Sequence, residues 1–237
     1  MSAWKAKRFW TSATVVQADA GFAVELDGRP VKTPAKRALC VPTQAMAQAI
    51  AIEWDAQEDV IKPATMPATK TANAAIDKVA VQHAEVAELL AAYGDSDLLC
   101  YRAENPEELV ARQAEIWDPM LDWAEEALNA RLHARIGIMH VPQDGDTIAE
   151  LSRRTHALDP FELAAFHDLV SLSGSLVLGF AAAMDAQPAD TLWDISRLDE
   201  LWQEEQWGED EEATALAAVK RDAFLHASRM FGLLQEK

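Results

Sequence analysis

The sequence contains only two cysteines, Cys40 and Cys100, and they form no CxxC pair. A disulfide framework or a zinc site needs more cysteines or a closer spacing, so neither is expected. Both thiols lie in apolar stretches, which favours buried, unreactive side chains. Such sparing use of cysteine fits a protein that works in a reducing compartment.

Long apolar segments are also missing. The longest uncharged run, residues 169–184, contains three serines and is shorter than the ~20 residues that a membrane-spanning helix requires. The first eight residues, MSAWKAKR, include no apolar core of a signal peptide and are too few for a transit peptide. We therefore expect a cytoplasmic protein that does not insert into membranes.

Basic residues are scarce. The chain has 21 Lys and Arg against 39 Asp and Glu, a formal net charge of −18. Such a surface repels the phosphates of nucleic acids and anionic lipids, so a nucleic-acid partner is not expected and a basic protein surface is favoured. The charge is also uneven, because ten acidic residues and a single basic one, Arg197, lie between positions 190 and 212.

Sequence motifs of common enzyme classes are absent. There is no GxSxG, GxGxxG or HExxH, and the six histidines have no metal-binding spacing. Gly174 and Gly179 have the spacing of a phosphate-binding loop, but Phe180 and Ala181 stand where that loop needs Lys and Ser or Thr. We therefore expect no ATP site, no metal and no other cofactor.

The best candidate for catalytic chemistry is the pair Asp95 and Asp97, which lies close to Tyr101 and Arg102. Two neighbouring carboxylates can share a metal or a proton, as in a metal- or carboxylate-dependent hydrolase. The alternative is a capped turn after Gly94, where short polar side chains are favoured anyway.

The pattern of residues that are present predicts an α+β fold. Four short β-rich segments (residues 14–16, 22–26, 31–33 and 37–41) and the turn signal Asp27-Gly28 predict a small antiparallel meander. Thr43 is a plausible N-cap of a helix that follows. Pro63 and Pro67 bracket a break near residue 65, which divides a β-containing N-terminal domain (1–65) from a helical, orthogonal bundle-like domain (66–237).

Helical patterns fill the second domain. They predict helices over about 68–93, 106–130, 146–157, 160–184, 189–206 and 210–235. Asn105 reads as the N-cap of the second of these helices, and Pro119 as a bend or a split within it. Gly174, Ser175 and Gly179 indicate close approach between helices.

The acidic segment after position 190 combines an apolar stripe with tryptophans and carboxylates. A solvated acidic helix face is one reading of this pattern, and a docking surface for another protein is the other, because tryptophans with a charged rim are common at interfaces. The docking reading predicts a partner-binding site at Asp199, Glu200, Trp202, Glu204, Trp207 and Asp210.

Four blocks, in order along nearly the whole chain, match one known family: Arg8-Phe9-Trp10 with residues 26–34; residues 49–54 with Ile61-Lys62-Pro63, Met66-Pro67, Asn73 and Ala75-Ile76-Asp77; residues 93–102 with Arg112-Gln113 and Trp117-Asp118-Pro119; and residues 196–200 with Trp207-Gly208. On these blocks the chain resembles the assembly chaperones of the ATP synthase α subunit, the "ATP twelve" family.

The resemblance implies a chaperone, not an enzyme. Members of the family bind the unassembled α subunit of the F-type ATP synthase and prevent its aggregation until the β subunits arrive. The resemblance also implies a small β-containing domain followed by a helical one. An acidic residue linked to function in the family matches Asp199 or Glu200, and we favour Glu200. Mitochondrial members carry a targeting extension, whereas this chain begins seven residues before Arg8, which points to a bacterial cytoplasmic member.

Overall fold

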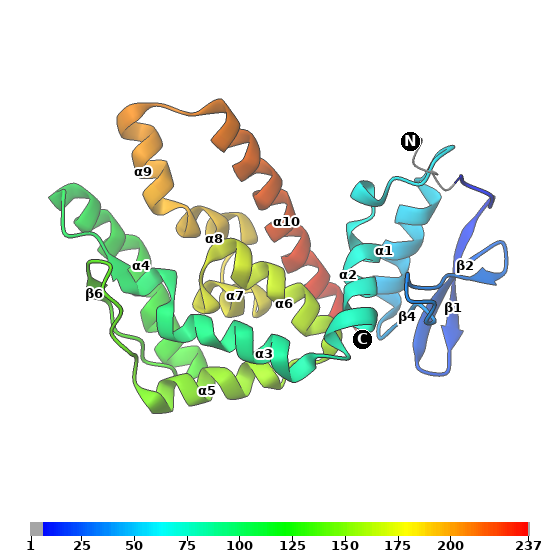
Figure 1. The fold of residues 1–237 in the computed structure, drawn as a ribbon, viewed down its shortest axis with the longest axis horizontal. Helices are drawn as coiled ribbons and strands as arrows, with labels where there is room; N and C mark the ends of the chain where they lie inside the picture. The colour runs from blue at the N-terminus through cyan, green and yellow to red at the C-terminus, as the bar shows by residue number, and fades with distance from the viewer. Residues whose placement is uncertain (1–6, 237) are drawn as a thin grey trace. The chain divides into compact units, whose positions relative to one another are not determined.

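The computed structural model describes residues 7–236, and their contacts fall into two compact units (Figure 1). The first unit holds the described residues up to His83, together with Pro160–Ala165 and the end of the chain from Arg229. The second holds Ala84–Asp159 and Phe166–Ser228. The predicted boundary near residue 65 falls inside the first unit by contacts, and an independently folding domain of residues 1–65 stays a prediction.

A small antiparallel sheet begins the first unit. Strands β1 (Ala13–Ala18) and β2 (Gly21–Leu26) pair along their whole length, and β2 also pairs with β3 (Arg29–Pro30) and β4 (Cys40–Val41). Asp27 and Gly28 both have positive φ, 48° and 78°, as a two-residue hairpin turn requires. The predicted small antiparallel sheet and its turn are therefore confirmed, but the third strand lies at Arg29–Pro30 and not at 31–33, and the fourth strand pairs with β2 and not with β3.

Helix α1 (Gln44–Asp55) packs on this sheet and buries Met46 and Ile50. It begins where the sequence predicts, because the Thr43 hydroxyl oxygen accepts a hydrogen bond from the Met46 N–H at 3.2 Å. A short 3-10 turn, η1 (Pro63–Thr65), leads to α2 (Pro67–Ala74). The Glu53 carboxylate accepts the N–H groups at the start of α2, so it ties that helix to α1 (Figure 1).

The helix predicted over 68–93 is interrupted. A π-helical turn, η2 (Ala75–Val79), follows α2, and α3 (His83–Ala91) begins only after a turn. Two 3-10 turns, η3 (Ala92–Ser96) and η4 (Leu98–Cys100), come next. Asp77 lies in the π-helical turn and accepts hydrogen bonds from the Thr33 hydroxyl at 2.7 Å and the Ala35 N–H at 3.0 Å. Local helical periodicity carries no information about these partners more than forty residues away.

Most of the remaining chain is helical, as expected for an α+β fold with the helices after the sheet. The elements are β5 (Tyr101–Arg102), α4 (Glu107–Leu128), β6 (Arg135–Ile136), α5 (Gly145–His156), α6 (Pro160–Ser173), α7 (Leu176–Ala183), α8 (Ala189–Ser196), α9 (Leu198–Trp207) and α10 (Glu211–Gln235). Within residues 7–236, no helix combines the length and the apolar character needed to cross a membrane.

The core of the second unit forms around α7, in which every residue up to Ala182 is buried. A Cβ atom on Gly179 would lie 2.6 Å from the Val170 side chain of α6. The close helix approach predicted at Gly179 is therefore confirmed.

Two long predicted helices are each divided in two. The helix predicted over 160–184 breaks at Gly174, whose φ of +71° ends α6, and Ser175 then caps α7. The helix predicted over 189–206 breaks at Arg197, which separates α8 from α9.

The start of α4 also differs from the prediction. The cap position belongs to Pro106, not to Asn105, and no side chain caps it. Pro119 lies inside an unbroken helix, so it does not split α4.

Candidate partner-binding site

Helix α9 carries most of the predicted partner-binding residues, and its period of 3.6 residues divides them between two faces. Leu198, Leu201, Trp202 and Glu205 follow one another at helical spacing on the first face. Glu200, Gln203, Glu204 and Trp207 do so on the second. The first face meets α4, and the second lines a groove towards α10.

Polar contacts fix the first face of α9, and Asp199 beside it, to α4. The Asp199 carboxylate accepts a hydrogen bond of 2.7 Å from the side-chain amide of Gln113, which is 1% exposed. Arg112 donates two hydrogen bonds to Glu205, at 2.6 and 2.9 Å, and its guanidinium lies 5.9 Å from the Trp202 ring centre. Hydrogen bonds from Arg112 lower the pKa of Glu205, so this carboxylate stays charged in the pair.

The segment that leads into α9 is anchored on the same helix. The indole N–H of Trp117, a fully buried side chain of α4, donates to the Ile195 carbonyl at 2.9 Å. Gln113 completes the support, because its carbonyl oxygen accepts the Ala103 N–H at 2.8 Å. One face of α4 thus positions α8 and α9 at several points.

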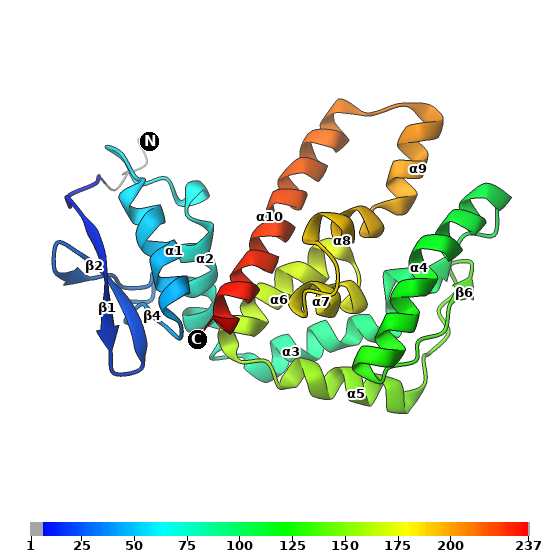
Figure 2. The same cartoon turned by 180° about the vertical axis from the view of Figure 1, so that it is seen from behind.

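The second face of α9 borders a groove of about 360 Å³. The chain reverses between α9 and α10 (Figure 2), and both helices contribute to the lining. Trp207, Ala213, Leu216 and Ala217 provide its apolar part, whereas its charged part comes from Arg197, Glu200, Glu204, Asp210 and Lys220. Arg197 reaches Glu200 and Glu204 at 3.5 and 3.6 Å, so its own charge is balanced locally.

The groove ends at the turn between the two helices. Gly208, with a φ of +89°, ends α9. The Asp210 carboxylate accepts the N–H groups of Glu212 and Ala213, both at 2.9 Å, and therefore caps α10. Asp210 thus has a structural role that the docking prediction did not include.

The six predicted residues are brought together only in part. Glu200, Glu204, Trp207 and Asp210 line the groove, and Trp207 is 79% exposed. Asp199 and Trp202 instead lie on the side of α9 that faces α4. The sequence reading missed Leu216 of α10, which is 55% exposed within the groove, because an isolated leucine in an alanine-rich helix gives no sign of whether it will be covered.

The hydrolase alternative at Asp95 and Asp97 is wrong, because the two carboxylates serve different parts of the backbone. Asp97 is fully buried and accepts the N–H groups of Leu99 and Val177, both at 3.0 Å. Asp95 accepts a hydrogen bond from the Gln143 backbone N–H at 2.7 Å, and its Oδ2 lies 3.2 Å from Nε2 of His140. Among residues 7–236, no group of three or more His, Cys, Asp or Glu side chains is arranged to hold a metal ion.

The environment of Asp97 is that of a structural cap. Burial raises its pKa to about 6, against the opposing effect of the hydrogen bonds from Val177 and Ser175. Val177 is in the first turn of α7, so Asp97 and the N-cap Ser175 both satisfy N–H groups at this helix start. The capping alternative for this sequence block is the correct one.

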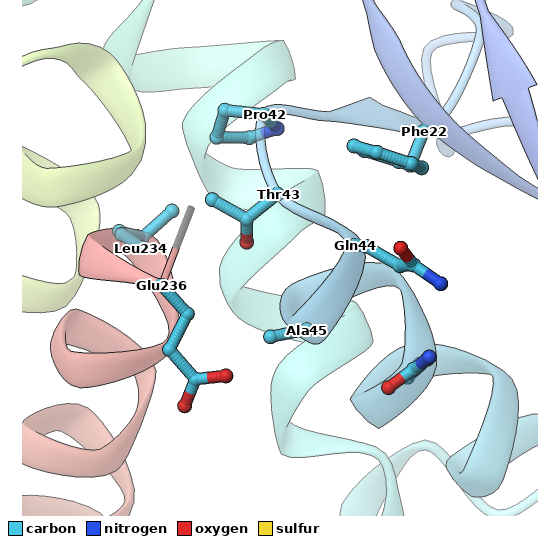
Figure 3. A pocket seen from close by; sticks show the side chains of 8 residues that line it. Phe22, Pro42, Thr43, Gln44, Ala45, Leu234 and Glu236 are labelled. Carbon is cyan, nitrogen blue, oxygen red and sulfur yellow. The ribbon is translucent and has the colours of Figure 1, made fainter.

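A second depression, of about 450 Å³, lies in the first unit at the start of α1 (Figure 3). Glu236 is the one ionisable residue among the eight that line it. The Thr43 hydroxyl already donates to the Leu233 carbonyl at 2.8 Å. The lining therefore offers no pair of groups for acid–base chemistry.

The chain is similar to proteins that are described as chaperones. The family model described as "ATP12 chaperone protein" matches residues 7–125. "Protein atp12, mitochondrial" of Schizosaccharomyces pombe is 27% identical over 220 residues, which cover 87% of this chain and 75% of the relative.

Solved structures extend the similarity to almost the whole chain. Atp12 from Paracoccus denitrificans is 48% identical, with a TM-score of 0.96 over 98% of this chain and 100% of the other. A mutant of the same Paracoccus protein, in which one aspartate is replaced by lysine, gives the same identity and TM-score over 99% of this chain and 100% of the other.

Proposed function

Since the chain belongs to the ATP12 chaperone family, and is a chaperone of ATP synthase assembly and not an enzyme, we propose that its client is the unassembled α subunit of the F-type ATP synthase. On this proposal the chain binds the α subunit in the cytoplasm of a bacterial cell until a β subunit displaces the chaperone. The similarity to a bacterial Atp12 supports the cellular setting.

The observation that carries the proposal is the groove of α9 and α10, with the exposed Trp207 and a carboxylate-rich wall. Subunits of a ring expose apolar interfaces before assembly, and such patches aggregate. Aromatic side chains surrounded by polar groups are typical of protein-binding surfaces. A contact of this kind can cover the patch and still be displaced by the true neighbour, so release needs no ATP site.

The test is whether the chain protects isolated α subunit. We expect a stoichiometric amount to suppress the light scattering of α subunit diluted from denaturant, and to form a complex with it on gel filtration. Unchanged scattering with no complex would overturn the proposal.

A charge reversal tests the place of contact. Glu200→Lys alters an exposed side chain of the groove, so we expect the variant to fold normally and to lose protection. Glu126→Lys makes the same charge change at an exposed position of α4 outside the groove and serves as the control. Equal protection by the two variants would reject the groove as the contact.

A further inference from the structure

We infer that the groove between α9 and α10 receives a basic amphipathic helix of the client, which packs on the two helices as a third. This inference rests on the proposed function and specifies which kind of client segment the groove recognises. It follows from the exposed apolar lining, the exposed first half of α10 and the charge around the groove.

The apolar part of the groove lining is exposed. Trp207 and Leu216 line the groove and are 79% and 55% exposed. Large apolar side chains that gather on one concave surface mark an interaction site, whereas single exposed ones do not. Small residues, Ala213 and Ala217, separate the large ones, so a helix can approach the α10 backbone closely.

The first half of α10 is ready to act as one wall of a helix-binding groove. From Glu211 to Asp222 every residue except Ala217 is exposed, so this stretch receives little support from packing. It nevertheless forms helix, because it is rich in alanine, is capped by Asp210 and carries Glu211 and Glu212 at its positive end. A preformed helix adds little ordering cost when a partner binds.

The charge around the groove selects a basic occupant. Eight acidic residues and no basic residue lie between positions 198 and 212. Glu205 is neutralised by Arg112, and Arg197 is shared by Glu200 and Glu204. Lys220 is the other cation of the lining. The lining therefore has three carboxylates against two cations, and the exposed Glu209, Glu211 and Glu212 beside it add further negative charge. A partner with Lys or Arg beside its apolar stripe has complementary charge.

The spacing of the lining residues suits a helix more than an extended strand. The lining residues of α9 lie at positions i, i+3, i+4 and i+7, namely Glu200, Gln203, Glu204 and Trp207. Those of α10 have the same spacing, namely Ala213, Leu216, Ala217 and Lys220. Ridges of this kind on two neighbouring helices can receive the apolar stripe of a third helix.

Site-specific cross-linking tests the occupant directly. The photoreactive residue p-benzoylphenylalanine replaces Leu216 in the full chain, and replaces Leu89 of α3, which is 59% exposed, in the control. Each variant is mixed with isolated α subunit, illuminated and analysed by mass spectrometry. We expect position 216 alone to cross-link, and to a helical segment of the α subunit with net positive charge.

The outcomes separate this inference from the proposed function. A complex on gel filtration without a cross-link at position 216, or with a cross-link to an acidic or extended segment, overturns the inference and leaves the client unchanged. Cross-linking to a second copy of this chain overturns it as well. Failure to form any complex overturns both.

A client-free measurement uses a fluorescent peptide of roughly 18 residues, five helical turns, with leucine and lysine at amphipathic spacing. We expect binding by fluorescence anisotropy, and roughly tenfold weaker binding to the double variant Glu200→Lys, Glu204→Lys. A peptide of the same composition in scrambled order, which cannot form an apolar stripe, serves as the control. Equal binding of the two peptides would mean charge attraction alone and would overturn the helix-in-groove inference.

Discussion

At the scale of single residues, Asp199 and Glu200 are neighbours in the chain with different surroundings. Asp199 accepts a hydrogen bond from the buried amide of Gln113, whereas Glu200 is exposed and 3.5 Å from Arg197. A residue that holds α9 on α4 affects the groove through the position of the helix. A residue on the groove wall affects the client directly. The choice between them as the acidic residue that matters stays a prediction.

Unfolding measurements distinguish the two positions. We expect Asp199→Lys to lower the free energy of unfolding by about 1–3 kcal/mol, because the buried Gln113 amide loses its acceptor. Glu200→Lys is expected to change it by less than about 0.5 kcal/mol, as for other exposed side chains. Urea titration of both variants measures this difference, and Asp199→Asn, which keeps an acceptor oxygen, is the control. Equal destabilisation by the two lysine variants would contradict the assignment.

A pH-dependent stability is expected from Asp97. Its pKa in the folded protein, about 6, lies above the ordinary value of 3.8 because the side chain is buried. Protonation therefore favours the folded state, and this contribution is present in full below pH 3.8 and is lost as the pH rises through about 6.

Asp97→Asn removes this titration. Both carboxylate oxygens of Asp97 accept backbone hydrogen bonds, so the variant also places its side-chain NH2 group, a donor, against one of these backbone N–H donors. We expect it to destabilise the protein, and to do so by about 1 kcal/mol more near pH 5.2 than near pH 7.5. Urea unfolding of the wild type and the variant at the two pH values measures the difference. A destabilisation that does not depend on pH would contradict the raised pKa.

At the scale of elements, α5 and α10 are both capped by aspartate but differ in how they are packed. Asp144 accepts the N–H groups of Asp146 and Thr147 at the start of α5, where Thr147 and Leu151 are buried. Asp210 caps α10, whose first three turns have little packing. The same local motif therefore begins a helix with buried residues in its first two turns and a helix whose first three turns are exposed.

Removing each cap is expected to have a different consequence. Asp210→Ala should speed hydrogen exchange of the amides near positions 212–215 and leave the midpoint of global unfolding unchanged, since that end of α10 opens by itself. Asp144→Ala should lower the free energy of global unfolding by about 1 kcal/mol. Hydrogen exchange with mass spectrometry and urea titration check the two outcomes. A global loss of stability in Asp210→Ala would show that the first turns of α10 are packed.

At the scale of the whole molecule, we expect charge to govern encounters with the proposed client. The net charge of −18 and its concentration after position 190 favour approach of a basic surface. We expect the association rate with α subunit, measured by stopped-flow fluorescence, to fall at least about tenfold between low and physiological salt, with a smaller change in dissociation rate. An association rate that does not respond to salt would contradict electrostatic steering.

The sequence by itself determined the features that depend on local chemistry. Asp27-Gly28 set the hairpin because positive φ is required there, and Thr43 set the start of α1 by capping it. The periodicity of hydrophobic residues predicted the α+β class. The distribution of acidic residues and tryptophans along the chain located the acidic segment after position 190.

Only the tertiary structure decided how these elements are used, because the deciding contacts join residues far apart in the chain. Asp97 reads as a catalytic candidate until Val177, eighty positions later, is seen to donate to its carboxylate. Asp199 and Glu200 look equivalent in the sequence, but in the structure only Asp199 accepts a hydrogen bond from the Gln113 amide. Leu216 gives no sign in the sequence of whether it will be covered, and the packing leaves it 55% exposed. Burial and long-range hydrogen bonding are properties of the assembled chain, and local pattern does not encode them.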